Sequence, residues 1–113
     1  MTVTPFSLKL DLSEIGMKMF FKSYQIIVLD VLFDNPDGLN SRQVWQKTKE
    51  AIPNTISRAS VINFLNSLVD LEVLEYKEVS GKGGYRRIYW HQYTKKDLAK
   101  FLSNKVTNAL KTL

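Results

Sequence analysis

Basic side chains are concentrated in the last third of the chain, where they could neutralise a polyanion. The segment 80–113 holds eight Lys and Arg residues and one acidic residue, Asp97, whereas the segment 1–79 holds eight basic and ten acidic residues. The formal net charge of +5 is therefore a property of the C-terminal third. Such asymmetry is typical of proteins that contact nucleic acid or another polyanion, although a solvated lysine-rich helix would give the same count.

Residues that could catalyse a reaction or hold a metal ion are scarce. The chain has no cysteine and a single histidine, His91, which excludes thiolate ligands and a histidine cluster. The Ser and Thr residues gather at predicted helix starts, where capping explains them. Gly81, Gly83 and Gly84 are not followed by a helix, so they do not form a phosphate-binding loop. We expect neither an enzyme nor a bound cofactor nor a metal site.

A slim polar helix face is the leading candidate for a binding surface. The predicted helix after residue 57 gathers its apolar residues in one sector and small or amide side chains in the opposite one. The latter are Ala59, Ser60, Asn63, Asn66 and Ser67. A helix enters the DNA major groove only if such a face is slim and can hydrogen-bond to base edges. Asn63 could pair with adenine, Ser60 could serve either kind of base, and Ala59 could touch a thymine methyl group.

Two helix starts add candidate phosphate contacts through backbone N–H groups, hydroxyl groups and cations. Their residues are Ser41, Arg42 and Gln43 in one helix and Thr55, Ser57 and Arg58 in the other. The N-terminus of a helix carries a positive dipole end and unpaired N–H groups, which favour an anion. The sequence therefore predicts that these positions hold the DNA backbone while the polar face contacts bases.

A predicted β-hairpin brings further cations close together. Lys82, Tyr85, Arg86 and Arg87 lie at or next to a glycine-rich turn, 80–84, between expected strands 74–79 and 85–90. Such a thin basic tip can follow a phosphate track or enter a minor groove. Because side chains alternate along a strand, we expect only one of Arg86 and Arg87 to point at DNA.

Periodicity and helix caps place these residues in a definite order of elements. We expect a strand at 6–12, a short helix at 14–21, helices beginning near Ser23, Ser41 and Thr55 or Ser57, the hairpin, and a helix capped by Thr94. Three helices followed by a glycine-tipped hairpin is the order of a winged helix-turn-helix domain. The predicted fold class is mainly α with a small β-hairpin (α+β), in a single domain spanning 1–113. Within it, 1–22 is an N-terminal arm, 23–93 the winged-helix core and 94–113 a C-terminal helix.

The segments that carry the helix-turn-helix resemble a known family. The stretch TISRASVINFLNSLVDLEVLEY (55–76), the run YQIIVLDVLFDNPDGLNSRQVW (24–45) and the loop KEAIPN (49–54) are similar to the winged-helix domain of bacterial penicillinase-type repressors and antibiotic-resistance regulators. The resemblance covers roughly 70 residues and shares an apolar spacing common to winged helices. It implies operator binding by a dimer, with the polar residues at the start of the third helix contacting bases.

The C-terminal helix carries one apolar stripe that needs a partner surface. The stripe consists of Leu98, Phe101, Leu102, Val106, Leu110 and Leu113. It could pack on its own domain or on the same helix of a second chain, and we expect the second, because the hairpin carries the chain away from the three-helix core. A two-fold axis would then set two recognition helices about 34 Å apart, one turn of DNA. The arm could complete the same interface.

These observations predict a homodimeric regulator that binds double-stranded DNA in a sequence-specific manner and represses transcription by occupying a promoter. Two alternatives stay open: a winged-helix module that holds protein in a larger complex, and a non-specific, chromatin-like DNA binder. The N-terminus lacks a basic segment leading into an apolar run, and no apolar stretch approaches the roughly 20 residues that span a bilayer. We therefore expect a cytoplasmic protein without a membrane segment.

Overall fold

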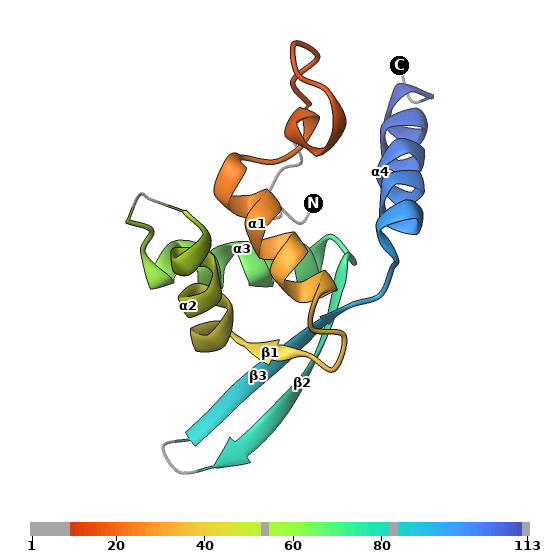
Figure 1. Cartoon of the computed structure of the whole chain (residues 1–113). Coiled ribbons are helices and arrows are strands. Elements are labelled where there is room, and N and C mark those ends of the chain that lie inside the picture. Colours follow the sequence, from red (N-terminus) through yellow and green to blue (C-terminus); the bar gives the residue numbers. More distant parts are fainter. Residues whose placement is uncertain (1–9, 53–54, 82–83, 112–113) are drawn as a thin grey trace.

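The computed structural model describes residues 10–52, 55–81 and 84–111, and the winged-helix order of elements is confirmed (Figure 1). A 3-10 helix, η1, precedes three α-helices, a hairpin and a last helix, with a short strand between α1 and α2. The bounds are η1 Gly16–Met19, α1 Ser23–Phe33, β1 Leu39–Asn40, α2 Ser41–Ala51, α3 Arg58–Asp70, β2 Leu74–Gly81, β3 Gly84–His91 and α4 Lys95–Leu110. The predicted class, mainly α with a small sheet, is correct.

Helices α2 and α3 each begin at a polar cap, but one cap differs from the expected residue. Asn40, not Ser41, caps α2: its side-chain Oδ1 accepts from the backbone N–H of Gln43 at 2.9 Å, and Gln43 Oε1 accepts from the Asn40 N–H at 3.0 Å. Such a reciprocal pair satisfies two N–H groups that the helix itself leaves free. Ser57 caps α3, as one of the two expected residues. Lys22 occupies the N-cap position of α1, so the expected cap at Ser23 is wrong.

The sheet has three antiparallel strands in the order β1-β3-β2, one more than the sequence predicts. Leu39 of β1 pairs with Tyr89 of β3, and this close approach depends on Gly38. Gly38 has a φ of +99°, and a Cβ atom there would lie 2.7 Å from Ile88 Cγ2 and 3.0 Å from the carbonyl oxygen of Tyr89. Only glycine fits such a position without strain or displacement.

The hairpin is longer and its turn tighter than the sequence predicts. Strands β2 and β3 pair from Leu74 opposite His91 as far as Gly81 opposite Gly84, so only residues 82 and 83 connect them. The expected five-residue tip is therefore wrong, because three of those residues belong to the strands. Paired strands reach further from the helices, and the end of the hairpin projects well below them (Figure 1).

The expected N-terminal strand is not present in the part of it that the structure describes. Residues 6–9 lie outside the described ranges, and Leu10 to Leu12 form coil and a turn. Asp11 shapes this segment: its N–H donates to the carbonyl oxygen of Met19 at 2.7 Å, and its Oδ1 accepts from the N–H of Ser13 at 2.9 Å. These local hydrogen bonds fold the segment back on η1, which competes with an extended strand.

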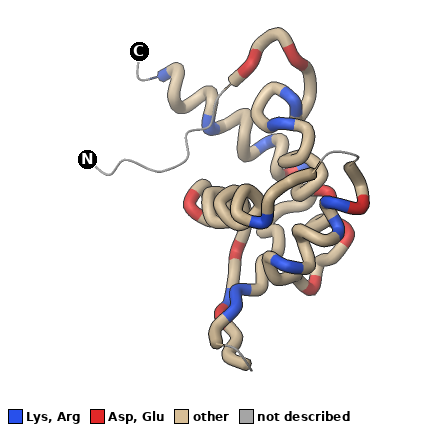
Figure 2. The backbone as a smooth tube through the Cα atoms, turned by 90° about the vertical axis from the view of Figure 1, so that its left-hand side faces the viewer, with Lys and Arg blue, Asp and Glu red and all other residues tan. Residues whose placement is uncertain are grey.

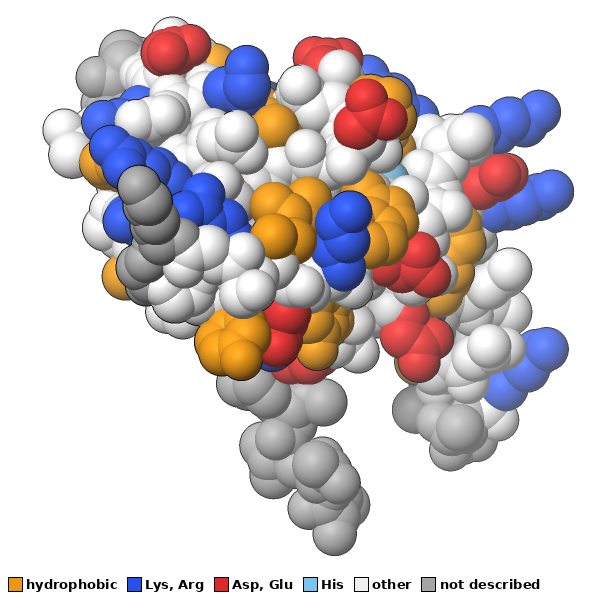
Figure 3. All heavy atoms as spheres, turned by 90° about the horizontal axis from the view of Figure 1, so that it is seen from below, with side chains coloured by type: hydrophobic (Ala, Val, Ile, Leu, Met, Phe, Trp, Pro, Cys, Tyr) orange, Lys and Arg blue, Asp and Glu red, His pale blue; other side chains and the backbone are white. Residues whose placement is uncertain are grey.

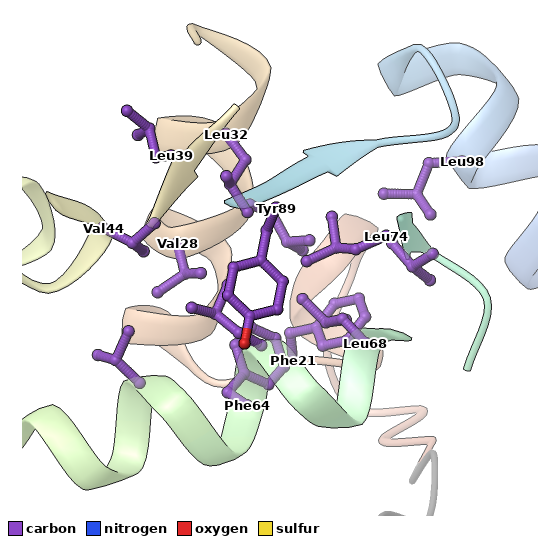
Figure 4. Packing of buried hydrophobic residues seen from close by; sticks show 14 of the residues in the cluster. Phe21, Val28, Leu32, Leu39, Val44, Phe64, Leu68, Leu74, Tyr89 and Leu98 are labelled. Atoms are coloured by element: carbon purple, nitrogen blue, oxygen red, sulfur yellow. The ribbon is translucent and has the colours of Figure 1, made fainter. Parts of the chain in front are cut away.

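One hydrophobic core joins the three helices, the sheet and the first half of α4. Tyr89 lies at its centre between the sheet and α3, and Phe64 of α3 meets Phe21 edge-to-face at 5.8 Å between ring centroids (Figure 4). Leu98 and Leu102 of α4 belong to this core, with 0% and 1% of their surface exposed. Figure 4 shows Leu98 on the same side of the cluster as Leu74.

Because these two leucines are buried, the expectation that the whole apolar stripe of α4 forms a dimer interface is wrong. Leu98 and Leu102 pack inside their own chain, so they are not available to a second copy. Phe101 is half-buried against Tyr93, Val106 is half-buried, Leu110 is 60% exposed, and Leu113 lies outside the described residues. The stripe thus divides into an inner half that docks α4 and an outer half that faces solvent. No helix in the described ranges is long and apolar enough to cross a membrane.

Candidate nucleic-acid interface

The turn between α2 and α3 is fixed by a tryptophan. Trp45 of α2 donates from its indole Nε1 to the carbonyl oxygen of Ile56 at 2.9 Å, and Ile56 is itself buried in the core. The ammonium of Lys49 lies 3.7 Å from the centre of the Trp45 ring. A buried indole N–H normally needs such a partner, and here the bond ties α2 to the residue just before the α3 cap. It sets the start of α3 relative to α2.

The first turn of α3 presents both hydroxyl groups and a cation. The backbone N–H of Ser60 donates to Ser57 Oγ at 3.0 Å, and the two hydroxyl oxygens lie 2.8 Å apart. Ser57 and Ser60 therefore organise the helix start, and one hydroxyl proton serves the bond between them. Thr55, Arg58 and Ala59 are exposed beside them.

Along α3 the exposed ridge is made of small and amide side chains, as predicted. Ala59 and Asn63 are exposed one turn apart, and the hydroxyl of Ser67 folds back on the carbonyl oxygen of Asn63 at 2.7 Å. Asp70 is also exposed, at the far end of the same ridge. A carboxylate there would face DNA phosphates unfavourably, so only the first two turns of α3 suit a groove.

Two of the three residues predicted to contact phosphate at the start of α2 lie at the surface. Arg42 and Gln43 are exposed and Ser41 is half-buried. Since Gln43 Oε1 already accepts from Asn40, its amide group is held in one orientation. This leaves Arg42 as the exposed cation at this helix start.

The hairpin separates its two arginines, as strand alternation requires. Arg86 is exposed on one face, next to Tyr85, which is 81% exposed and lies on the other face. Arg87 instead turns towards α3, where its Nη1 donates to Asn66 Oδ1 at 3.2 Å. Lys82 lies outside the described residues. Among the described hairpin residues, Tyr85 and Arg86 are therefore the accessible members of the predicted set.

The cations do not form one continuous surface. Seen from below, Lys and Arg side chains gather at the edge of the molecule away from α4, and a second group projects from the outer side of α4 (Figure 3). Exposed hydrophobic and acidic side chains lie between the two groups. At the opposite end of the molecule from the hairpin, the loop that follows residue 10 carries exposed Asp11 and Glu14 (Figure 2).

Sequence reasoning assigned no role to two residues that organise this region. Asn66 was expected only as part of the polar face, yet its Oδ1 accepts from both Arg87 and the hydroxyl of Tyr89, the latter at 2.7 Å. Asn40 was overlooked as the α2 cap because Ser41, also a good capping residue, follows it directly. In the sequence Asn66 belongs to the polar sector of this helix, so residue spacing alone does not indicate its contacts with β3.

Comparison with solved structures finds one of similar fold and two weaker likenesses, among others. A possible transcriptional regulator from Methanosarcina mazei Go1 matches 81% of this chain and 72% of its own, with a TM-score of 0.63 and 17% sequence identity. The PcaV transcriptional regulator from Streptomyces coelicolor, solved with its natural ligand, matches with a TM-score of 0.49 and 20% identity over 82% of this chain and 63% of its own. F93 from STIV, a winged-helix DNA-binding protein, matches with a TM-score of 0.45 and 18% identity over 87% of this chain and 92% of its own.

No protein-family model and no curated protein sequence matches the chain. The expected likeness to penicillinase-type repressors therefore stays a prediction. At 17% identity the likeness to the Methanosarcina protein concerns the fold alone. The chain is a winged helix-turn-helix protein in its architecture.

Proposed function

We propose that this chain binds double-stranded DNA, with the first two turns of α3 in the major groove and the β2–β3 hairpin along the adjacent backbone. The observation that carries the proposal is the ridge of α3, where Ala59 and Asn63 are the exposed residues between Arg58, next to the capped N-terminus, and Asp70. So slim a face allows close approach to base edges, whereas long charged side chains would hold the helix away.

Each exposed residue has a role that follows from its chemistry. Asn63 would pair with adenine, and Ala59 would contact a thymine methyl group. Arg58 and the N–H groups of the first α3 turn would bind phosphate, together with Arg42 and Gln43 at the start of α2. Tyr85 and Arg86 would contact the backbone next to the groove. Because α3 carries a single cation, we expect the hairpin to supply much of the affinity and α3 the sequence preference.

We further propose that the chain acts as a homodimeric transcriptional regulator, as a repressor that occupies a promoter. The Methanosarcina protein of like fold is described as a possible transcriptional regulator, and a DNA partner goes with the cytoplasmic location expected from the sequence. Two-fold symmetry would let two copies of α3 contact successive major grooves.

The dimer surface we propose lies at the end of the molecule opposite the hairpin. Ile15 and Leu12, 85% and 79% exposed, belong to the loop before η1, and Leu110, 60% exposed, belongs to the outer half of α4. Both segments lie at this end of the molecule (Figures 1 and 2). The loop 10–15 carries Asp11 and Glu14 and no cation, whereas residues 98–110 of α4 carry lysines and no acidic residue. An isologous dimer pairs each loop with the partner's α4, so these opposite charges would meet.

Selection from random duplexes with the purified chain, followed by affinity measurements over a range of salt concentrations, tests the proposal. We expect a sequence that is bound tightly at a salt concentration where random duplexes have dissociated. Equal affinity for all duplexes would identify a non-specific, chromatin-like binder. Absence of duplex binding at low salt would overturn the proposal and favour a protein-interaction module.

A further inference from the structure

Arg87 of β3 contacts Asn66, Tyr76 and Glu78, while 38% of its side chain stays exposed. Its Nη1 donates to Asn66 Oδ1 of α3 at 3.2 Å, and its Cζ lies 4.1 Å from the centre of the Tyr76 ring. Its Nε is 3.9 Å from Glu78 Oε1, and the hydroxyl of Tyr89 shares the same Asn66 oxygen at 2.7 Å. The guanidinium therefore bridges both hairpin strands and α3.

The register of the hairpin explains why these groups meet. Glu78 pairs directly with Arg87, and Tyr76 pairs with Tyr89, so all four side chains project from the face that packs on α3. Arg86 projects from the other face and is exposed. Two neighbouring arginines thus have different surroundings, and only one of them is held by the protein.

The arrangement suits a guanidinium and not an ammonium. A planar guanidinium can stack on the Tyr76 ring while its Nη1 donates to Asn66 and its charge lies near Glu78, 3.9 Å from Nε. A lysine at this position would carry the same charge but could not stack on the ring through a planar group and donate from the edge of that group. Since Arg87 can only donate, the amide oxygen of Asn66 must face β3, which also fixes the orientation of that amide.

The contacts connect the hairpin to the rigid part of the molecule. Tyr89 is buried in the core, and burial raises the pKa of its hydroxyl while the charge of Arg87 opposes the change, so the hydroxyl stays a donor to Asn66 at neutral pH. Asn66 lies one turn after Asn63 on α3. The hydrogen bonds of Asn66 thus link the expected base-contacting helix directly to β3 at Arg87 and Tyr89.

We propose that Arg87 is a positioning residue: with Asn66, Glu78 and Tyr76 it fixes the angle of the hairpin to α3, and does not itself bind phosphate. The inference rests on the proposed DNA binding. Fixing this angle sets the distance between the bases that α3 contacts and the backbone that Tyr85 and Arg86 contact. A free hairpin would have to be ordered on binding, at a cost in affinity.

The conservative variant Arg87→Lys separates positioning from charge, with Lys77→Arg, at an exposed position of β2 that has no proposed DNA contact, as its matched control. Affinity for the selected duplex should fall roughly tenfold in Arg87→Lys and stay near the wild-type value in Lys77→Arg. Asn66→Ala should lower it by a similar factor, and the double variant should be no weaker than either single variant because both break one network. If Arg87→Lys binds like the wild type while Arg87→Ala binds more weakly with a shallower salt dependence, Arg87 is a phosphate contact and the proposal is wrong.

A distance measurement without DNA tests the positioning on its own. Because the chain lacks cysteine, Gln46→Cys on α2 and Ser80→Cys on β2, both exposed positions, can carry a spin-label pair. The distance distribution should broaden in Arg87→Lys and Asn66→Ala and stay unchanged in Lys77→Arg. An unchanged distribution in all three would overturn the inference. If the distribution broadens but no duplex binds, the positioning holds and the proposed DNA binding fails.

Discussion

The imidazole ring of His91 stacks on the ring of Phe33, with centroids 3.6 Å apart and 6° between the ring planes. His91 Nε2 lies 3.0 Å from the carbonyl oxygen of Leu29, which can only accept, so Nε2 carries the proton. Its Nδ1 is buried and has no hydrogen-bond partner among the described residues. The ring joins the end of β3 to α1 in its neutral form.

The stability of the protein should fall as pH falls through the range in which His91 titrates. Burial lowers the pKa of His91 below its ordinary value of about 6.5, and the bond to Leu29 and the charge of Asp30 oppose the shift only in part. Below that value the unfolded chain binds a proton that the folded chain resists, so stability is full above about pH 6.5 and declines below it. Urea unfolding at pH 8 and pH 5.5 should show a larger loss for the wild type than for His91→Gln. Equal losses would contradict this role of His91.

Gly38→Ala should destabilise the protein by about 2 kcal/mol or more, because it adds both a strained backbone and a collision with Ile88. Gly16→Ala is the matched control, since Gly16 also has a positive φ, +64°, but open space around its Cβ position. The control should lose only the backbone part, on the order of 1 kcal/mol. Urea denaturation of both variants measures the difference, and equal losses would mean that β1 can move away from β3 at little cost.

Truncation of Leu98 should lower the stability of the fold, whereas truncation of Leu110 should weaken self-association. Leu98→Ala leaves a cavity in the core and should lower the free energy of unfolding by about 2–5 kcal/mol at every protein concentration. Leu110→Ala removes an exposed side chain and should change the unfolding of dilute protein by less than about 0.5 kcal/mol. Sedimentation should show weaker self-association in Leu110→Ala. A Leu98→Ala variant that loses only self-association would show that the inner half of α4 binds a partner instead.

Asn63→Ala and Arg86→Ala should weaken DNA binding in distinguishable ways. Loss of a base contact at Asn63 should reduce affinity for the selected sequence roughly 10-fold and relax preference at one base pair, leaving random duplexes unaffected. Loss of a backbone contact at Arg86 should weaken binding to all duplexes and reduce the salt slope by about 1. Lys96→Ala, at an exposed position in the first turn of α4, is the control and should bind like the wild type. Fluorescence anisotropy at several salt concentrations measures all three, and a sequence-independent effect of Asn63→Ala would exclude it as a base contact.

The long helices and the hairpin were predictable from the sequence because their signals are local. Apolar spacing defines α3, and Ser57 and Thr94 stand where capping residues belong. The β1 strand was not predictable, because two residues have no periodicity and Leu39 gains its partner only when β3 arrives. The prediction that small and amide side chains form the exposed face of α3 was also correct. A helix that packs through one apolar sector leaves the opposite face exposed.

The packing partners of Arg87 and of the α4 leucines could not be predicted from the sequence, and the reason is the same for both. An apolar stripe shows that Leu98 and Leu102 must be buried but not against what, and an arginine near a turn could face solvent or α3. In the structure the first half of α4 packs on the core of its own chain. The register of the strands places Arg87 on the face of the hairpin that contacts Asn66. Both outcomes depend on contacts between segments far apart in the chain, which residue spacing alone does not encode.

The pairing of Leu39 with Tyr89 has a consequence for the route by which the chain folds. Two residues connect β2 and β3, so this hairpin can form within microseconds. The pairing of β1 with β3 closes a much longer loop, because α2, α3 and β2 lie between the two strands in the chain. The contacts of β1 should therefore be absent from the rate-limiting transition state. Stopped-flow kinetics of Gly38→Ala would then show faster unfolding at a nearly unchanged folding rate, and a slowed folding rate would place β1 in the nucleus. This short strand thus governs how long the native state persists more than how fast it is reached.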